Sequence, residues 1–468
     1  MKRNYFIFCL FSLGLFATCN PPKKSWDVRE FGAVADSVTM NTKAIQQAID
    51  ACHQAGGGIV ELKEGEYISG TILLKDNVTL SVSKDAKLIG SPNPMDYQSI
   101  DPFTDATGQL RGKCLVGSLN ATNVGIIGGG VIDGQGEMFK KGKLLSTMKK
   151  LGVDKSEINA YASNRPFLVR FVKSTDIVVE DIELRQPAAW TCHFFQCSKI
   201  KVNKVKIYSH AHKNNDGIDL DSSSDGIVTN CDIDAGDDAI CFKSTSPVPT
   251  QNIQVSNCKL KSDWGTIKFG TESMGDFKNI TVKNCKIYDT KGGGIKILSV
   301  DGANISDITI DSIQMENVDM PIFIRLGERL RTYRGAPQQA VGSITNVRIS
   351  NVVATARSLD ESRVTPPSGV FITGTPNHKI GKVSLKNIQV NLPGGGTAEQ
   401  SELEVPEDEK RYPEFSFFGV SPASGLYARH VQYLSVDALS VSLVAKDDRQ
   451  GFIYSDVDNK NLNDVQID

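Results

Sequence analysis

Two short acidic segments carry the residue types that acid–base chemistry needs. The first reads Asn214-Asn215-Asp216-Gly217-Ile218-Asp219, and the second, further along the chain, reads Gly236-Asp237-Asp238. Carboxyl groups held close together resist ionising at the same time, so one of them keeps its proton to a higher pH than usual. Such a set can supply both a proton donor and a base for water, which hydrolysis of a glycosidic bond requires. A Ca²⁺ site or a series of Asx turns would use the same residue types.

A sequence repeat predicts the elements that position these segments. Similar triplets start at intervals of 27 residues, at Asn203, Asn230, Asn257, Asn284 and Asp311. Alternating apolar residues surround each copy, which predicts short strands. Two or three such strands per repeat would coil into an all-β fold, a single-stranded right-handed parallel β-helix of the pectin-lyase type. An Asn at one place in each coil could pair its amide with the next coil.

Aligning the coils by one apolar position places the acidic residues. The aligned position holds an isoleucine in five successive coils: Ile218, Ile240, Ile267, Ile295 and Ile322. Two residues earlier, Asp216 and Asp238 should then stack on neighbouring strands, ~4.7–4.9 Å apart, with Asp237 beside them. One residue later, Lys268 and Lys296 should stack on the following two coils. Stacked carboxylates destabilise a fold, so the cluster is a candidate functional site.

These motifs resemble those of the family 28 glycoside hydrolases, the polygalacturonases and rhamnogalacturonan hydrolases, over residues 26–353. The first acidic segment is similar to their Asn-Thr-Asp-Gly-x-Asp motif and the second to their Asp-Asp motif. The resemblance implies an inverting hydrolase of pectin without a metal or organic cofactor. Asp237 would be the general acid, Asp216 and Asp238 would hold and deprotonate the attacking water, and Asn214 would orient the site.

Two family motifs are not kept. A Gly-His-Gly motif is expected on the coil after the acids, but Gly265 stands where the His would be. An Arg-x-Lys motif, which grips a substrate carboxylate, is expected one coil later, where this chain has Lys296-Ile297-Leu298. Lys268 and Lys296 could form a new anion subsite or simply be solvated. We favour the subsite, because stacked like charges serve no structural purpose.

The expected substrate is a uronate-containing polysaccharide or oligosaccharide. Trp264 could offer its ring to a sugar, or it could cover the bend of its coil. The full set of expected substrate-binding residues is Asn214, Asp219, Trp264, Lys268, Lys296 and Arg325.

Two other functions remain open at this point. In a polysaccharide lyase on the same fold, Lys268 or Lys296 would be the base and the acids would hold Ca²⁺. A glycan-binding protein with a decayed site would account for the two lost motifs, although not for the intact acids. The net charge of −2 gives no reason to expect a nucleic-acid partner, and we expect a monomer.

The N-terminus has the pattern of an export signal. A basic start at Lys2 precedes an apolar run over residues 5–17, too short for a membrane span of ~20 residues. The run ends in a loose lipoprotein box in which Cys19 would be lipidated. Residues 1–24 would be this signal and a tether, and residues 25–468 a single β-helix catalytic domain with C-terminal loop insertions. We expect an exported protein, either a periplasmic or cell-surface lipoprotein or a secreted one.

The first part of the domain is expected to contain a helix. Ile45, Ala48, Ile49 and Cys52 fall on one helical face, and three glycines from Gly56 end the pattern. Such a helix could cap the first coil and hide its open strand edges. Cys231, Cys258 and Cys285 share one spacing, which favours a stack of small buried side chains over a set of disulfides.

Overall fold

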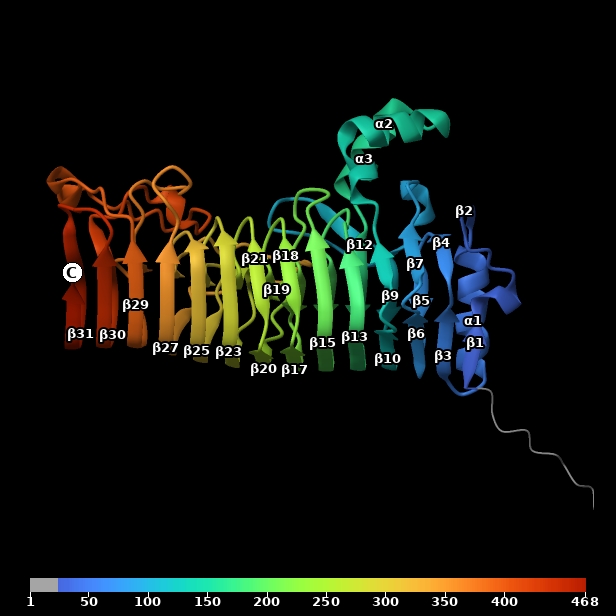
Figure 1. The fold of residues 1–468 in the computed structure, drawn as a ribbon, viewed down its shortest axis with the longest axis horizontal. Helices are drawn as coiled ribbons and strands as arrows, with labels where there is room; N and C mark the ends of the chain where they lie inside the picture. The colour runs from blue at the N-terminus through green and yellow to red at the C-terminus, as the bar shows by residue number, and fades with distance from the viewer. Residues whose placement is uncertain (1–23) are drawn as a thin grey trace, which may run out of the picture.

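A computed structural model describes residues 24–468, and Cys19 lies outside these described residues. The chain winds into a long solenoid, with its coils side by side along the molecule (Figure 1). All strand pairs between coils are parallel, and one hydrophobic core runs through the coils from Trp26 to Val441. The expected parallel β-helix is therefore confirmed.

The strands form three stacked sheets, and the acidic residues belong to the first. Its strands pair in the order β5 (Ile72–Leu74), β9 (Leu110–Leu119), β12 (Phe167–Val172), β14 (Cys192–Phe195), β16 (Ile218–Asp221), β19 (Ile240–Ser244), β22 (Ile267–Ser273), β24 (Ile295–Ser299), β26 (Ile322–Leu326) and β28 (Val370–Thr373).

The second sheet begins with β1 (Ser25–Asp27), β3 (Gly58–Leu62), β6 (Val78–Val82) and β10 (Thr122–Ile127), and later includes β17 (Ser224–Thr229) and β20 (Thr250–Ser256). The third contains β2 (Asp36–Met40), β4 (Gly65–Ser69), β7 (Ala86–Gly90), β11 (Val131–Asp133), β18 (Asp232–Ala235) and β21 (Lys259–Ser262).

Longer strands run through both of these sheets: β13 (Thr175–Arg185), β15 (Ser198–Ser209), β23 (Phe277–Thr290), β25 (Asn304–Val318), β27 (Ser343–Ala356) and β29 (Ile380–Leu392). The last two strands, β30 (Ala423–Leu443) and β31 (Gln450–Ile467), complete the solenoid.

The isoleucine alignment is confirmed, because each of the five isoleucines pairs with the next across strands β16, β19, β22, β24 and β26. The predicted constant interval of 27 residues is wrong for the first and the last of the five repeated triplets. Asn203 pairs with Thr229 and Asp311 pairs with Lys283, so Lys204 and Ser312 are the true equivalents of the repeated asparagines.

Backbone conformation explains the repeated Asn better than amide pairing does. Lys204, Asn230, Asn257, Asn284 and Ser312 all have φ between 53° and 57°, in the left-handed region that Asn tolerates better than most residues. Amide pairs between coils do form elsewhere, from Asn230 to Asn203 (2.9 Å), one residue out of this register, and from Asn387 to Asn351 (2.8 Å) in later coils.

Helix α1 (Thr42–Gln54) closes the N-terminal end of the core. Its buried face contains the predicted Ile45, Ala48, Ile49 and Cys52. The three later cysteines are buried and unbridged, as the repeat predicts. None of the helices among residues 24–468 is long and apolar enough to cross a membrane.

Several excursions leave the solenoid on the side of the first sheet. Strand β8 (Ser99–Thr104) turns back antiparallel to β9, and helices α2 (Lys141–Lys150) and α3 (Ile158–Ser163) project from the coils (Figure 1). Short 3₁₀ turns lie at Val28–Phe31, Pro94–Asp96, Gly136–Phe139, Lys155–Glu157, Ala398–Glu402 and Phe415–Phe417. Three later insertions, residues 327–342, 357–369 and 393–422, bring distant side chains to the middle of the first sheet.

Candidate active site

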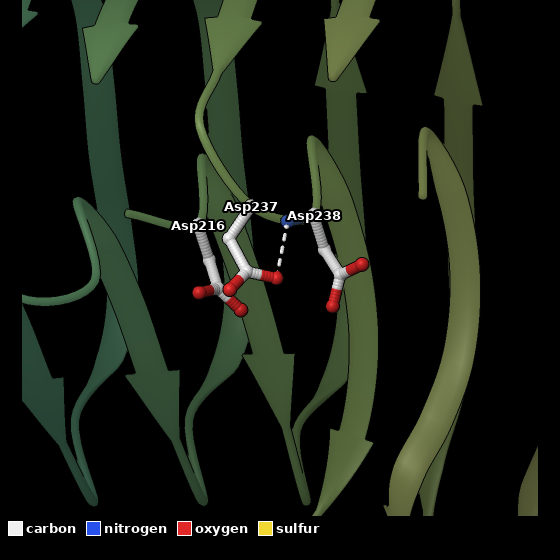
Figure 2. Close-up of side chains that lie close together, drawn as sticks. All are labelled: Asp216, Asp237 and Asp238. Carbon is white, nitrogen blue, oxygen red and sulfur yellow. Dashed lines mark hydrogen bonds between the residues drawn. The ribbon is translucent and has the colours of Figure 1, made fainter. Parts of the chain in front are cut away.

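Three aspartates meet where the chain enters two neighbouring strands of the first sheet. Asp216 precedes β16 and Asp238 precedes β19, so the two side chains point the same way from adjacent coils, with Asp237 between them (Figure 2). One oxygen of each carboxyl group lies within 4.8 Å of the others. The backbone N–H of Asp238 donates to Asp237 Oδ1 at 3.0 Å, which fixes the Asp237 side chain.

Two buried lysines distinguish these acids from one another. Lys243 Nζ lies 3.2 Å from Asp216 Oδ2, and Lys268 Nζ lies 2.6 Å from Asp238 Oδ2. None of the ion pairs among residues 24–468 includes Asp237. Two of the three carboxyl groups therefore have a neutralising cation, and the third has none.

The pKa values follow this difference. Burial raises the pKa of Asp237 well above its usual range, and the charges of Asp216 and Asp238 raise it further. Burial also raises the pKa of Asp216, but Lys243 opposes the effect and the value reaches only about 6. The arrangement thus favours the protonated form of Asp237 and, through Lys243, the ionised form of Asp216, so the first carboxyl group suits an acid and the second a base.

A cavity of about 260 Å³ opens over the three acids. Strands β16, β19 and β22 form its floor, while the β8–β9 turn and the insertion 393–422 supply parts of its wall. The residues that line it are Asp105, Ala106, Thr107, Trp190, Asn214, Asp216, Asp237, Asp238, Lys243, Trp264, Lys268, Thr271, Glu272 and Tyr412.

Six of the residues singled out from the sequence line this cavity: Asp216, Asp237, Asp238, Asn214, Trp264 and Lys268. The other three do not. Asp219 is buried beneath Asp216, and Lys296 Nζ is bound to Glu414 Oε2 at 2.6 Å, with both side chains fully buried. Arg325 donates to backbone oxygens of Gly374 and Glu407 away from the cavity. This geometry does not support the predicted contacts of Asp219, Lys296 and Arg325 with a substrate.

Lys268 and Lys296 are not solvated, because Lys268 is 3% exposed and Lys296 is 0% exposed. The pair does not form one anion subsite either, because only Lys268 reaches the cavity. Lys268 also approaches the Tyr412 hydroxyl, at 3.4 Å.

The lost Gly-His-Gly histidine has a steric explanation. A Cβ atom on Gly265 would lie 2.9 Å from Lys296 Cδ and 3.1 Å from Asp238 Oδ1. The lysine side chains thus occupy the space that a larger residue in this column would need. The Gly265 N–H also donates to Asp238 Oδ1 at 3.2 Å. Leu298, where the family's Lys is missing, packs in an apolar cluster with Phe323 and Phe371.

Asn214 is held by two arginines that no motif or repeat predicts. Its side-chain oxygen accepts from Arg111 Nη2 at 3.2 Å and from Arg165 Nη2 at 3.0 Å. Both arginines lie well upstream of Asn214: Arg111 is in β9, and Arg165 lies between α3 and β12.

Other cavity residues were also missed from the sequence. Lys243 could have been found, because it lies three residues after the aligned Ile240 and faces Asp216. Asp105, Thr107 and Glu272 reach the cavity through loop and bulge geometry that no repeat predicts. Trp190 is both a packed core residue and part of the cavity wall.

A divalent cation could in principle bind the three carboxyl groups, which are close enough to share one. The ammonium groups of Lys243 and Lys268 already bring two positive charges to these acids. The donor set therefore fits a site that works by acid–base chemistry with its own side chains better than it fits a metal centre.

The model of the glycosyl hydrolases family 28 matches residues 69–408. The chain belongs to this family. The family resemblance expected from the two acidic motifs is thereby confirmed.

Two curated relatives illustrate how this family 28 member compares with others. An exo-poly-alpha-D-galacturonosidase from Dickeya chrysanthemi is 27% identical over 46% of this chain and 41% of its own length. An endo-polygalacturonase from Pectobacterium carotovorum is 28% identical over 47% of this chain and 56% of its own length. The chain thus spans about half the length of these relatives.

Solved structures support the fold of the family 28 chain. An exopolygalacturonase from Thermotoga maritima superposes with a TM-score of 0.66 at 22% identity, over 79% of this chain and 87% of its own. A family 28 exopolygalacturonase from Yersinia enterocolitica gives 0.68 at 20% identity, over 94% and 78%.

Proposed function

We propose that this family 28 protein hydrolyses glycosidic bonds in a uronate-containing plant polysaccharide of the pectin type. The observation that carries the proposal is the charge difference among the three acids: one carboxyl group without a cation beside two carboxylates that each contact a lysine. Hydrolysis needs this combination, because the leaving oxygen must receive a proton while water loses one.

In this mechanism Asp237 protonates the oxygen of the leaving sugar. Asp216 and Asp238 bind a water molecule between them and take its proton as it attacks the anomeric carbon. Asn214, fixed by Arg111 and Arg165, orients the sugar at the cavity edge. The configuration of the first product, read by NMR, tests the inverting course that the family resemblance implies.

The surroundings of the lysines favour hydrolysis over elimination by a lyase. A lyase base must be a neutral amine, but the Asp238 carboxylate, despite the opposing effect of burial, holds the pKa of Lys268 well above its usual range. Lys296 is sealed off in its pair with Glu414. Lys268 lines the cavity but is held toward its protonated form, and Lys296 does not line the cavity, so neither suits the role of a base.

The direct test uses pectic oligosaccharides of defined composition. Wild-type protein should release new reducing ends, and Asp237→Ala should lower kcat by at least ~10²-fold, the usual contribution of a general acid. Full activity in Asp237→Ala would rule out its role as the acid. An unsaturated product absorbing in the ultraviolet, lost with a chelator, would instead indicate a lyase, and binding without turnover a glycan-binding protein.

The walls of the cavity support action at a chain end. On the N-terminal side, Arg165 holds the lining residue Asn214 and also joins Gln109 at 3.0 Å; on the C-terminal side, Tyr412 from the insertion 393–422 lines the cavity beside Lys268. A polymer could not pass through such a cavity along the solenoid, whereas a chain terminus could enter it.

We also propose that the protein is exported and anchored by a lipid on Cys19. The basic start and the apolar run of residues 5–17 support this proposal. Replacement of Cys19 by Ser should move the protein from the membrane fraction to a soluble one.

A further inference from the structure

Lys243 lies among the acidic residues at the floor of the cavity. Its side chain is almost fully buried, and Nζ lies 3.2 Å from Asp216 Oδ2, 3.5 Å from Asp219 Oδ1 and 3.4 Å from Glu272 Oε2. The ammonium group also lies 4.5 Å from the centre of the Trp190 ring. One cation is thus shared by three carboxyl groups from two different coils.

Two of those carboxyl groups have few other partners. Asp216 Oδ1 and both oxygens of Asp219 are buried and accept no hydrogen bond from the described residues. In residues 24–468, Lys243 is also the one cation that forms an ion pair with either Asp216 or Asp219. Removing its charge would therefore leave Asp216 without direct compensation.

We propose that Lys243 is a positioning residue for the hydrolysis: its ammonium group keeps Asp216 ionised and aims its carboxylate at the attacking water. This inference depends on the proposed function. It adds a residue outside the two acidic motifs, and it gives Asp216 the same kind of support that Lys268 gives Asp238.

Glu272 extends the contact to the wall of the cavity. Its Oε1 accepts the backbone N–H of Ala106 at 3.3 Å, in the turn between β8 and β9, while Oε2 faces Lys243. Glu272 thus competes with Asp216 for the ammonium group. Its neutral isostere should leave more of that charge to Asp216.

The other titratable groups around Asp216 set the sign of the expected pH effect. Asp237 and Asp238 lie beside it, Asp219 lies beneath it, and Lys268 lies two coils further on. Burial and the charge of Asp238 raise the pKa of Asp216, whereas Lys243 and Lys268 lower it, so the loss of Lys243 should raise it further. Cys241, on the same strand as Lys243, carries no charge near neutral pH because burial raises its pKa. A base with a higher pKa becomes protonated at a higher pH as the pH falls, so the acid limb of the pH profile moves upward.

The test compares the pH profile of kcat/KM for wild type, Lys243→Met, Lys243→Arg and Glu272→Gln. Lys243→Met should move the acid limb upward by about one pH unit or more, the usual effect of losing an adjacent opposite charge. On that limb kcat should fall at least ~10-fold with little change in KM. Lys243→Arg should restore most of the profile, and Glu272→Gln should leave the acid limb in place or lower it.

The outcomes separate this inference from the proposed function. If wild type does not hydrolyse any pectic substrate, the proposed function fails, and the inference fails with it. If wild type is active and the acid limb of a folded Lys243→Met stays in place, the role of Lys243 alone is rejected. A Lys243→Met protein that loses activity equally at every pH would likewise reject it, since that indicates a purely structural contribution. Circular dichroism of each variant establishes that it is folded.

Discussion

At the scale of single residues, the three acids show how a fold can place like charges together and still assign them different roles. Asp216 and Asp238 each contact a lysine, whereas the Asp237 carboxyl group accepts a backbone N–H and forms no ion pair with the described residues. The pKa of this third carboxyl group is raised well above its usual range. The arrangement costs folding free energy at neutral pH, because the folded state must either keep that proton or bear an unfavourable charge.

Asp237→Asn should therefore make the folded protein more stable at pH 7 while abolishing activity. In the folded state the pKa of Asp237 is raised, so the folded protein binds more protons than the unfolded chain between the two pKa values, and its stability falls as pH rises through them. The gain in stability should therefore be largest at and above neutral pH and should vanish at acid pH, where the Asp237 carboxyl group is protonated in both states.

Thermal unfolding of wild type and Asp237→Asn at several pH values measures this effect. Asp225→Asn, at an exposed position of strand β17 in the second sheet, serves as a control and should change little at any pH. A variant that unfolds at the same temperature as wild type at pH 7 would contradict the raised pKa.

How much of the site the sequence predicts depends on which residues follow the repeat. Asp216, Asp238 and Lys268 lie on successive aligned strands, so counting from the isoleucines placed them correctly. Lys296 also follows the alignment, but its partner Glu414 comes from an insertion 118 residues later, and no pattern predicts that contact. The alignment gives the position of a side chain on its strand, but loops decide whether it reaches solvent.

At the scale of elements, the pair of Lys296 and Glu414 anchors the insertion 393–422 to strand β24. Both side chains are fully buried, at 2.6 Å. The same insertion carries Tyr412 into the cavity wall. The pair thus connects the C-terminal excursion to the coil where the family's Arg-x-Lys motif would lie, and a structural contact has taken the place of an expected substrate contact.

Glu414→Ala should destabilise the protein by about 3–5 kcal/mol, because it leaves the Lys296 charge buried and unpaired. It should also raise KM, since Tyr412 loses its anchor, and expose residues 393–422 to limited proteolysis. The double variant Lys296→Met with Glu414→Leu should recover most of the stability. Lys446→Ala, which removes an exposed pair with Asp448, should cost at most ~1 kcal/mol. Equal stability of Glu414→Ala and Lys446→Ala would contradict the anchoring role.

At the scale of the whole molecule, excursions from distant coils meet over the first sheet. Arg331 donates to the Ala106 carbonyl and Arg334 pairs with Asp101, so the insertion 327–342 is joined to the β8–β9 hairpin along one side of the cavity. The repeat predicts the solenoid itself, because each coil repeats the same apolar pattern. It does not predict this wall, because contacts between loops depend on lengths and turns that vary from coil to coil.

This wall leads to a prediction about how the polymer is cut. An enzyme with an open groove cuts within the chain, and viscosity falls quickly for few new reducing ends. A cavity bounded by Asn214, which Arg165 holds, on one side and by Tyr412 on the other should admit only a terminus, so viscosity should fall slowly while one small product accumulates from the start. The two curated relatives do not decide between chain-end and internal cleavage, because one is named for exo action and the other for endo action. The prediction of chain-end cleavage is therefore based on the cavity wall.

Opening the cavity should change this behaviour in a defined direction. Tyr412→Ala, or the pair Arg331→Ala and Arg334→Ala, should increase the viscosity lost per reducing end and lengthen the first products, because a polymer could then lie across the acids. Lys446→Ala, distant from the cavity, should leave the product pattern of wild type unchanged. Rapid loss of viscosity with the wild-type protein would show that the walls do not restrict entry, and chain-end action would then be excluded.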